Sequence, residues 1–291
     1  GSLTFAPGVT TQVVTVNIKN DGIYEGSETF NVNLSTPTNA TIADGVGIGT
    51  IKDDGSGLGG SDDDRPTLAV SSPTVAEDGG HAVFTLSLSN ASTIPTTVSL
   101  ALANGTASSP ADYTTALEVS TDGGVTWIAG NSATFAPGVT SVLARTPIVD
   151  DNLAEATETF TLTASTTAGA TANPDAVGTA SITDNDTPAF SINDVTVNEG
   201  AGTITFTVSL SNPSATATTV HYDTTPGTAT TPADYAAGLD ALSGTLTFAP
   251  NVTSQTITLN VANDTVYEGA ESLNVSLSAA TGGAVIADAL G

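Results

Sequence analysis

Carboxylates return at matched places along the chain, and they are the side chains whose type and spacing could do chemistry. The acidic segment NDGIYEGSETF (20–30) recurs as DDNLAEATETF (150–160) and as NDTVYEGAESL (263–273). Other acids recur in shorter motifs, which are TVAEDGG (74–80) with TVNEGAG (196–202), and GTASSPADY (105–113) with GTATTPADY (227–235). Repetition in register at distant positions favours a repeated cation-binding site over carboxylates spread for solubility alone.

The charge balance limits the partners of this chain. It carries 30 acidic and 4 basic residues among 291, which gives a formal net charge of −26. Nucleic acid and anionic membrane surfaces repel such a chain, so we expect neither as a partner. The sequence has no cysteine and no apolar run near the ~20 residues of a membrane span, so we expect no thiolate metal site and no membrane insertion.

The repeats divide the chain into segments of unequal completeness. We expect residues 1–61 to be the C-terminal half of a repeat that ends in a Gly/Ser linker, GSGLGGS (55–61). Residues 62–186 form a complete repeat with an inserted hairpin, STDGGVTW (120–127), and residues 187–291 form a repeat that lacks its last strand. A half-repeat is too short for an independent sandwich, so the sequence predicts that it is loosely ordered or docks on its neighbour.

Apolar and polar residues alternate with a period of two in short segments separated by Gly, Pro, Asn and Asp. No segment shows a sustained helical period. The alternation predicts half-buried strands at 82–88, 98–103, 142–149, 159–164, 203–210, 254–261 and 272–277. About seven strands in a domain of ~100 residues fit an immunoglobulin-like antiparallel sandwich. The predicted fold class is therefore all-β, with such sandwiches in tandem.

The strand order predicts where the acids of the second repeat meet. In a succession of seven antiparallel strands, every second connection and the end of the last strand lie at the same end of the sandwich. We therefore expect one acidic pole formed by Glu77, Asp112, Asp150, Asp151, Glu155, Glu158, Asp184 and Asp186. Calcium suits this pole because it takes six to eight oxygen ligands in flexible geometry. Zinc and copper are disfavoured by the lack of thiols and the scarcity of histidine.

The other two repeats carry parts of the same acidic set. The third offers Glu199, Asp234, Asp264, Glu268 and Glu271, and the first keeps Asp21, Glu25, Glu28, Asp53 and Asp54. The alternative interpretation is that these acids form only a solvated rim and hold no ion.

These motifs resemble those of the Calx-beta domain over nearly the whole chain. The shared pattern is TVxExxG, GTAxxPADY, [ND]DxxxExxE[TS][FL] and a closing DND. The family is known from sodium/calcium exchangers, integrin β4 and large bacterial surface proteins, and the resemblance implies that the acids named above bind calcium. Asn20 and Asn263 depart from the first Asp of the pair, and Ala156 departs from the Gly of YEG.

Other chemically active residue types carry no comparable signal. His81 and His221 occupy unmatched positions and have no nucleophile beside them in the sequence. Glu155 and Glu158 could be read as a catalytic pair, but a site repeated along a chain suits structure better than catalysis. The lone Trp127 is expected to pack on the inserted hairpin. We therefore expect that the protein is not an enzyme.

The function predicted first is a calcium-binding extender, or stalk, of an extracellular bacterial adhesin of the repeats-in-toxin type. Calcium ions and neighbouring repeats of the same chain would be its partners, at the bacterial cell surface or outside the cell. A second hypothesis is a regulatory calcium sensor attached to a membrane transporter or receptor. A third is a surface module that binds a ligand, for which the sequence shows no pocket motif.

Overall fold

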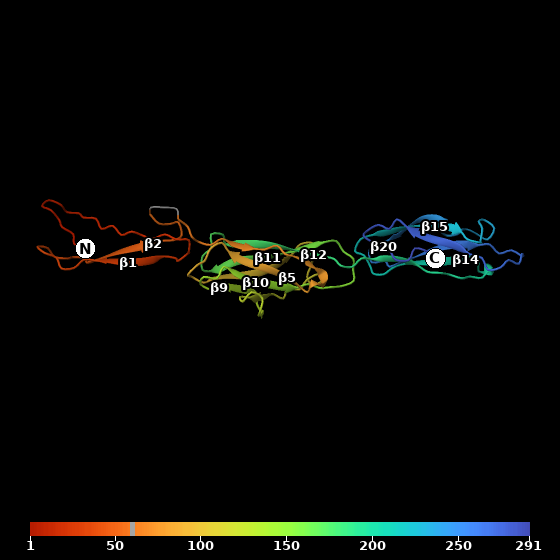
Figure 1. Ribbon diagram of the computed structural model, residues 1–291, viewed down its shortest axis with the longest axis horizontal. Helices are drawn as coiled ribbons and strands as arrows, with labels where there is room; N and C mark the ends of the chain where they lie inside the picture. Colours follow the sequence, from red (N-terminus) through yellow and green to blue (C-terminus); the bar gives the residue numbers. More distant parts are fainter. Residues whose placement is uncertain (59–61) are drawn as a thin grey trace.

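Short antiparallel strands build the whole chain, and they are grouped into successive bodies along one long axis (Figure 1). The computed structural model describes residues 1–58 and 62–291. We call residues 1–58 the first part, 62–186 the second part and 187–291 the third part. The end of the predicted Gly/Ser linker, 59–61, lies outside the described residues. The all-β fold class predicted from the sequence is confirmed.

The first part contributes almost nothing to a hydrophobic core. Its strands are β1 (Glu28–Asn33) and β2 (Val46–Ile51), which pair antiparallel. Within residues 1–58 only Tyr24 and Gly26 are buried. Tyr24 lies against the second part, where its N–H donates to the carbonyl of Ala91 at 3.1 Å. Burial in this part thus occurs where it meets its neighbour.

The second part is a sandwich of two five-stranded sheets. One sheet has the order β3 (Leu68–Val70), β5 (His81–Leu88), β10 (Ser141–Pro147), β7 (Glu118–Ser120) and β8 (Ile128–Ala129). The other has the order β4 (Thr74–Ala76), β12 (Asp175–Thr183), β11 (Glu158–Ala168), β6 (Thr96–Asn104) and β9 (Ser132–Phe135). A single 3-10 turn, η1 (Glu77–Gly79), follows β4.

The period-two alternation of these strands sends one set of side chains into a core of the second part. Every buried member of that core lies between Leu68 and Ile182, so the second part has a core of its own. Phe160 lies at its centre, stacked on Tyr113 at a centroid distance of 4.1 Å and edge-on to Phe84 at 5.9 Å. Such aromatic pairs add to the stabilisation from apolar burial.

The inserted segment 120–127 joins β7 to β8, which pair antiparallel. Asp122 fixes the turn by accepting the backbone N–H of Val125 and of Thr126. Trp127 packs under the guanidinium of Arg145, 4.1 Å from its ring centroid. The tryptophan therefore has a packing role on the hairpin, as the sequence predicted.

The third part repeats this architecture with fewer strands. One sheet has the order β16 (Tyr235–Ala237), β18 (Ser254–Val261), β14 (Thr203–Leu210), β13 (Ala189–Ile192) and β20 (Val285–Ile286). The other contains only β17 (Ser243–Phe248), β15 (Thr218–Pro226) and β19 (Leu273–Ser278), and a 3-10 turn, η2 (Glu199–Ala201), precedes β14. Phe190 and Phe248 meet edge-on in its separate core at 5.2 Å.

The main contrast between the second and third parts is the size of one sheet, which has five strands in the second part and three in the third. In the second part, β12 and β4 extend the sheet beyond β11. In the third part, the N–H of Gly291 donates to Val275 on β19 at 3.0 Å, at the place where β12 begins beside β11. Leu277 also donates its N–H to Ala289, and Ser276 pairs with Leu290, so residues 289–291 cover the middle of β19. Among the described residues this pairing is shorter than that of β12 with β11. The helical turns of the described residues are too short to cross a membrane.

Candidate metal centres

Three carboxylates from distant segments meet where the second part joins the third. Glu77 lies in η1, and Asp184 and Asp186 follow β12 on the way to β13. One oxygen from each lies within 4.8 Å of the others, and we call this group the Glu77 cluster. Glu77 is only 6% exposed, and Asp184 Oδ1 and Asp186 Oδ2 are buried without a hydrogen-bond partner. Buried oxygens without a partner are costly unless a proton or a cation compensates them.

A second group lies at the same end of the sandwich and consists of Asp112, Glu155 and Glu158, the Asp112 cluster. Their ligand oxygens also lie within 4.8 Å of one another. Asp112 Oδ2 accepts the N–H of Ser108 at 2.6 Å, which fixes this carboxylate in the turn of residues 108–112. The strand order predicted one acidic pole in the second part. In the structure these acids form two neighbouring clusters instead of one.

The pKa values of these acids show how poorly the clusters tolerate full ionisation. Burial raises the pKa of Glu77 to about 7, and the surrounding carboxylates add to the rise. Burial and the charge of Asp112 raise the pKa of Glu158 to about 7. Burial first, and then the charges of neighbouring carboxylates, raises the pKa of Glu155 and of Asp186. A bound cation would remove both the desolvation cost and the repulsion.

Asp150 and Asp151 stand beside these clusters without joining either trio. The backbone N–H of Asp151 donates to Glu77 Oε1 at 3.2 Å, and its own carboxylate accepts the N–H of Leu153 at 2.6 Å. The charge of Asp150 contributes to the raised pKa of Asp186. Asp150 and Asp151 therefore add a hydrogen bond and negative charge beside the clusters. The carboxylate oxygens that lie close enough together to hold an ion come from the two clusters.

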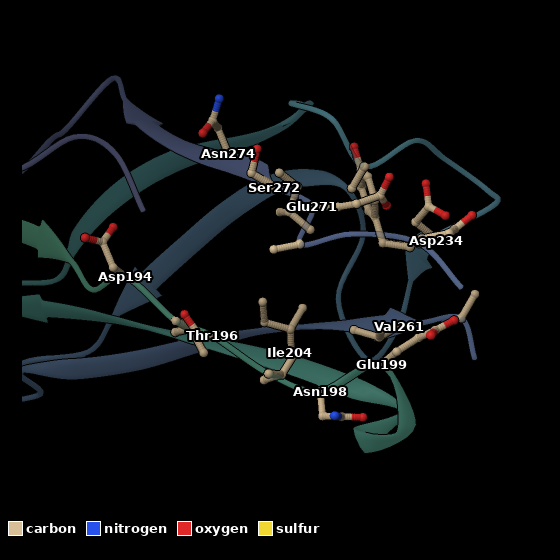
Figure 2. Close-up of a pocket in the computed structure, with 18 of the residues that line it drawn as sticks. Asp194, Thr196, Asn198, Glu199, Ile204, Asp234, Val261, Glu271, Ser272 and Asn274 are labelled. Carbon is tan, nitrogen blue, oxygen red and sulfur yellow. The ribbon is translucent and has the colours of Figure 1, made fainter. Parts of the chain in front are cut away.

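The third part carries a related but more open group, the Asp234 cluster of Asp234, Glu268 and Glu271. Asp234 Oδ2 accepts the N–H of Thr230 at 2.7 Å, as Asp112 does in its turn. Glu199 lies apart from this trio and accepts the N–H of Asp264 at 2.9 Å. These acids border a pocket of about 950 Å³, and Figure 2 shows Asp234 and Glu271 toward one end of it, with Asp194 at the other. Both glutamates of the trio are exposed.

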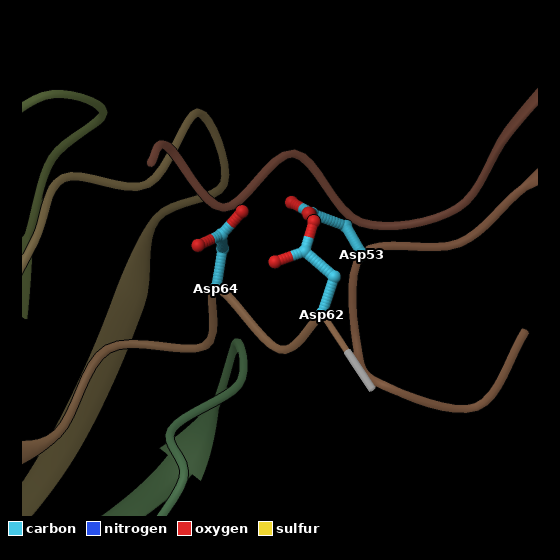
Figure 3. A group of neighbouring side chains, drawn as sticks. All are labelled: Asp53, Asp62 and Asp64. Atoms are coloured by element: carbon cyan, nitrogen blue, oxygen red, sulfur yellow. The ribbon is translucent and has the colours of Figure 1, made fainter. Parts of the chain in front are cut away.

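The junction between the first and second parts holds a fourth group, the Asp53 cluster of Asp53, Asp62 and Asp64. Figure 3 shows the three carboxylates turned toward a shared space. Asp54 lies outside it, because its Oδ1 accepts the N–H of Ser56 at 3.0 Å. The sequence interpretation named Asp53 and Asp54 and left out Asp62 and Asp64.

A signal for the two missed acids is present in the sequence. Asp62-Asp63-Asp64 precedes Pro66 as Asp184-Asn185-Asp186 precedes Pro188. The extra residues of the first junction split this motif in the sequence, and Asp54 pairs with Asp63 through the backbone. The N–H of Asp64 donates to the carbonyl of Asp53 at 3.3 Å, so residues from both sides of the insertion meet.

The other acids of the first part that the sequence predicted as ligands line a smaller pocket of about 200 Å³, shared with Asp53. They are Asp21, Glu25 and Glu28. The N–H of Glu25 donates to Asp53 Oδ2 at 2.8 Å, which ties this loop to the Asp53 cluster. The charge of Glu28 is the main cause of the raised pKa of Glu25.

The motifs that build these clusters also define a family. A family model described as the Calx-beta domain matches residues 1–54, 61–186 and 182–289. The chain belongs to the Calx-beta family. Its matched segments contain the acids of all four clusters, so each cluster is a feature of a Calx-beta unit or of the connection between two units.

Several known proteins are similar to this chain. The extracellular matrix organizing protein FRAS1 of Mus musculus is 28% identical over 293 residues, which are 97% of this chain and 7% of FRAS1. The crystal structure of CBD12 from CALX1.2 aligns at 23% identity and a TM-score of 0.34, over 73% of this chain and 80% of that one. The apo-form Calx CBD1 domain aligns at 22% identity and a TM-score of 0.32, over 41% and 99% of the two chains.

The donor atoms of the four Calx-beta clusters fit calcium. All of them are carboxylate oxygens, the ligands that a hard divalent cation prefers. The Glu77 cluster fits best, since two of its oxygens are buried and lack any other partner. Carboxylates held by turns, such as Asp112 and Asp234, are oriented before an ion arrives.

Proposed function

We propose that this chain is a calcium-binding structural segment of an extracellular protein, in which calcium stiffens a string of Calx-beta units. One observation carries this proposal: two of the four carboxylate clusters lie on the connections between units. Asp186 stands two residues before Pro188 at the start of the third part, and Asp64 stands two residues before Pro66 at the start of the second. Residues 1–61, 62–186 and 187–291 would act as successive units of the string.

Calcium at the Glu77 cluster would join three pieces of chain. These are η1, the end of β12 and the segment that leads into β13. An ion held between them would fix the direction in which the third part leaves the second. Without it, repulsion among the carboxylates favours separation of the same pieces. The Asp53 cluster would act in the same way on the first junction.

The setting that we propose is extracellular, as a stalk of a surface adhesin of the repeats-in-toxin type that holds a binding domain away from a bacterial cell. A string of acidic units suits this role, because extracellular calcium is abundant enough to fill sites with dissociation constants near ~1 mM. The similarity to FRAS1, an extracellular matrix organizing protein, supports an extracellular setting.

Small-angle scattering and melting curves of the whole chain, with calcium and with chelator, test the proposal. We expect calcium to raise the melting temperature and to narrow the distribution of end-to-end lengths of the chain in solution. Asp186→Asn should weaken both effects, whereas Asp175→Asn, an exposed acid outside every cluster, should leave them unchanged. The proposal is ruled out if the melting temperature and the length distribution of the chain are the same with calcium and with chelator. Micromolar affinity with a change of shape would instead favour the regulatory sensor.

A further inference from the structure

Both junctions of the chain are made by the same backbone contact. At the first, Tyr24 pairs in parallel with Ser92, donating its N–H to Ala91 at 3.1 Å and accepting the N–H of Thr93 at 2.9 Å. At the second, Ala154 pairs in parallel with Ser214, and the two hydrogen bonds, to Pro213 and from Ala215, measure 3.0 and 2.9 Å. Side-chain size differs between Tyr24 and Ala154, so the backbone defines this contact.

At each junction the contact is received by a turn of the following unit, which we call the receiving turn. The two receiving turns share a sequence and the same backbone hydrogen bond. They are Ser89-Asn90-Ala91-Ser92 and Ser211-Asn212-Pro213-Ser214, and the last serine of each is 4% exposed. The carbonyls of these serines accept the N–H of Gly138 and of Asn251, each at 2.9 Å. Each unit therefore holds its Ser-Asn-x-Ser turn in place to receive the unit before it.

The loop that docks on a receiving turn, which we call the presenting loop, is shaped by the same aspartate turn in all three parts. Asp21, Asp151 and Asp264 each accept the N–H of the residue two positions later, at 2.9, 2.6 and 2.6 Å. The docking residue follows one position further on, as Tyr24, Ala154 and Tyr267. The third part therefore presents a loop of the same local construction.

This third loop has no docking partner among the described residues. Tyr267 is 98% exposed, whereas Tyr24 and Ala154 are each 8% exposed. Val266 beside it is 61% exposed, and no backbone hydrogen bond of Tyr267 is present in the described chain. Both Ser-Asn-x-Ser turns are already occupied by the first and second parts, so an occupant must bring its own turn.

We propose that the loop 266–268 is a docking site for the Ser-Asn-x-Ser turn of a further Calx-beta unit. The turn that fits is the one at 89–94, because Tyr267-Glu268-Gly269 repeats Tyr24-Glu25-Gly26. At the first junction Gly26 has a positive φ of 81°, and a Cβ placed there would lie 2.7 Å from Ile94 Cδ1. Gly269 can adopt that conformation and leave the same room for an isoleucine.

The occupant is thus a unit like the second part rather than one like the third. At the positions of Gly26 and Ile94, the second junction has Ala156 and Thr216. A larger residue in the presenting loop is matched by a smaller one in the receiving turn. Gly269 should therefore select a unit with isoleucine there, and the exposed tyrosine ring should become buried as that of Tyr24 is.

An extended chain tests this proposal directly. Gly291 lies in register with Gly178, since a Cβ at either would meet the backbone oxygen of the matching residue, Asn193 or Ser71. Residues 179–187 appended after Gly291 would complete the β19 edge, and residues 66–186 appended after them would supply a unit with its own core. The control chain carries only the appended 179–187, which separates docking from completion of the strand.

Hydrogen exchange of the Tyr267 amide is the measurement, with the amides of Tyr24 and Ala154 as internal references. We expect exchange at least ~10-fold slower in the fully extended chain than in the control. Thr93→Pro in the appended copy removes the N–H that would bond to Tyr267 and should abolish much of this protection. Equal exchange in the two chains, or protection that ignores Thr93→Pro, would overturn the proposal.

The contact uses backbone groups, so the proposal stands apart from calcium binding. The exchange experiment is therefore run at saturating calcium and again with chelator. Protection in either condition supports docking, and its absence in both overturns docking whether or not the clusters bind the ion.

Discussion

The second and third parts carry matching acids on matching loops, yet only the second encloses them. Glu77 is 6% exposed, whereas its counterpart Glu199 is half-buried. Likewise Glu155 and Glu158 are half-buried, whereas the matching Glu268 and Glu271 are exposed to solvent. The difference follows from the sheet that contains β12. In the second part β12 pairs with β11 from Glu158 to Ser165, whereas in the third part only residues 289–291 pair with that edge of β19, opposite residues 275–277.

This contrast shows that the closing strand has two roles. It completes the sandwich, and it delivers two carboxylates to the place where the next unit begins. Burial is what raises the pKa of Glu77 to about 7, so the cost that a cation relieves is largest where the sandwich is closed.

The largest expected difference between the second and third parts is in the stability lost when an apolar side chain beside the closing strand is truncated. Phe160→Ala should destabilise the second part by about 3–5 kcal/mol, because the fully buried ring stacks on Tyr113. Leu273→Ala, at the matching position of the third part, should cost only about 1–2 kcal/mol, because Leu273 is half-buried. Urea unfolding followed by Trp127 fluorescence and circular dichroism measures both. Equal losses would show that the closing strand does not determine the packing.

The pH dependence without calcium should also separate the parts. The folded pKa of Glu77 is raised from 4.5 to about 7, so between these values the folded state binds more protons than the unfolded state. The stability of the second part should therefore fall as pH rises through this window, by up to ~3 kcal/mol from Glu77 alone. The stability of the third part should change less with pH, because Glu268 and Glu271 are exposed and Glu199 is only half-buried.

Calcium should cancel this pH dependence, because it binds the ionised carboxylates. Melting curves between pH 4.5 and 8, in calcium and in chelator, measure the effect. Stability that rises with pH in chelator would contradict the burial argument.

Neutralising the matching glutamate of each part, Glu77 or Glu199, gives a smaller and sharper comparison. Glu77→Gln should lower the calcium affinity of the second part by ~10-fold, about 1.4 kcal/mol, and should raise its stability at pH 7 in chelator. Glu199→Gln should do less, since Glu199 lies outside the Asp234 cluster. Calorimetric titration and chelator melting curves measure the two effects. An equal response of both variants would mean that Glu77 gains nothing from its place in the enclosed cluster.

The smallest expected effect comes from the inserted hairpin, which only the second part has. Trp127→Ala should cost ~1 kcal/mol or less, mainly from the lost contact with Arg145. Calcium affinity should not change, because the hairpin contributes no residue to either cluster. Calorimetric unfolding and calcium titration of this variant measure both. A loss of calcium binding would mean that the hairpin supports the acidic end.

The strands were predictable because each half-buried strand imposes a period of two on its own sequence. The alternation of 203–210 and 254–261 returns as β14 and β18 with the same bounds. The convergence of Glu77 with the acids after β12 was also predictable, because strand order alone sends them to the same end of the sandwich.

What the sequence did not predict depends on insertions and on backbone contacts. The loop between Asp54 and Asp63 interrupts the aspartate motif, so Asp62 and Asp64 resembled linker residues although they meet Asp53 in space. The junction at Ala154 matches the one at Tyr24 without sharing its side chain, because main-chain atoms make the contact. The side chain at the docking position therefore does not record the interface, although the Ser-Asn-x-Ser turn that receives it recurs in the sequence.

Calorimetric titration of calcium into the whole chain tests the central claim most directly. The wild-type chain should bind calcium with measurable heat, and Asp184→Asn together with Asp186→Asn should remove the binding that belongs to the Glu77 cluster. The account is contradicted if the wild-type chain takes up no calcium, or if the double variant binds it as the wild type does.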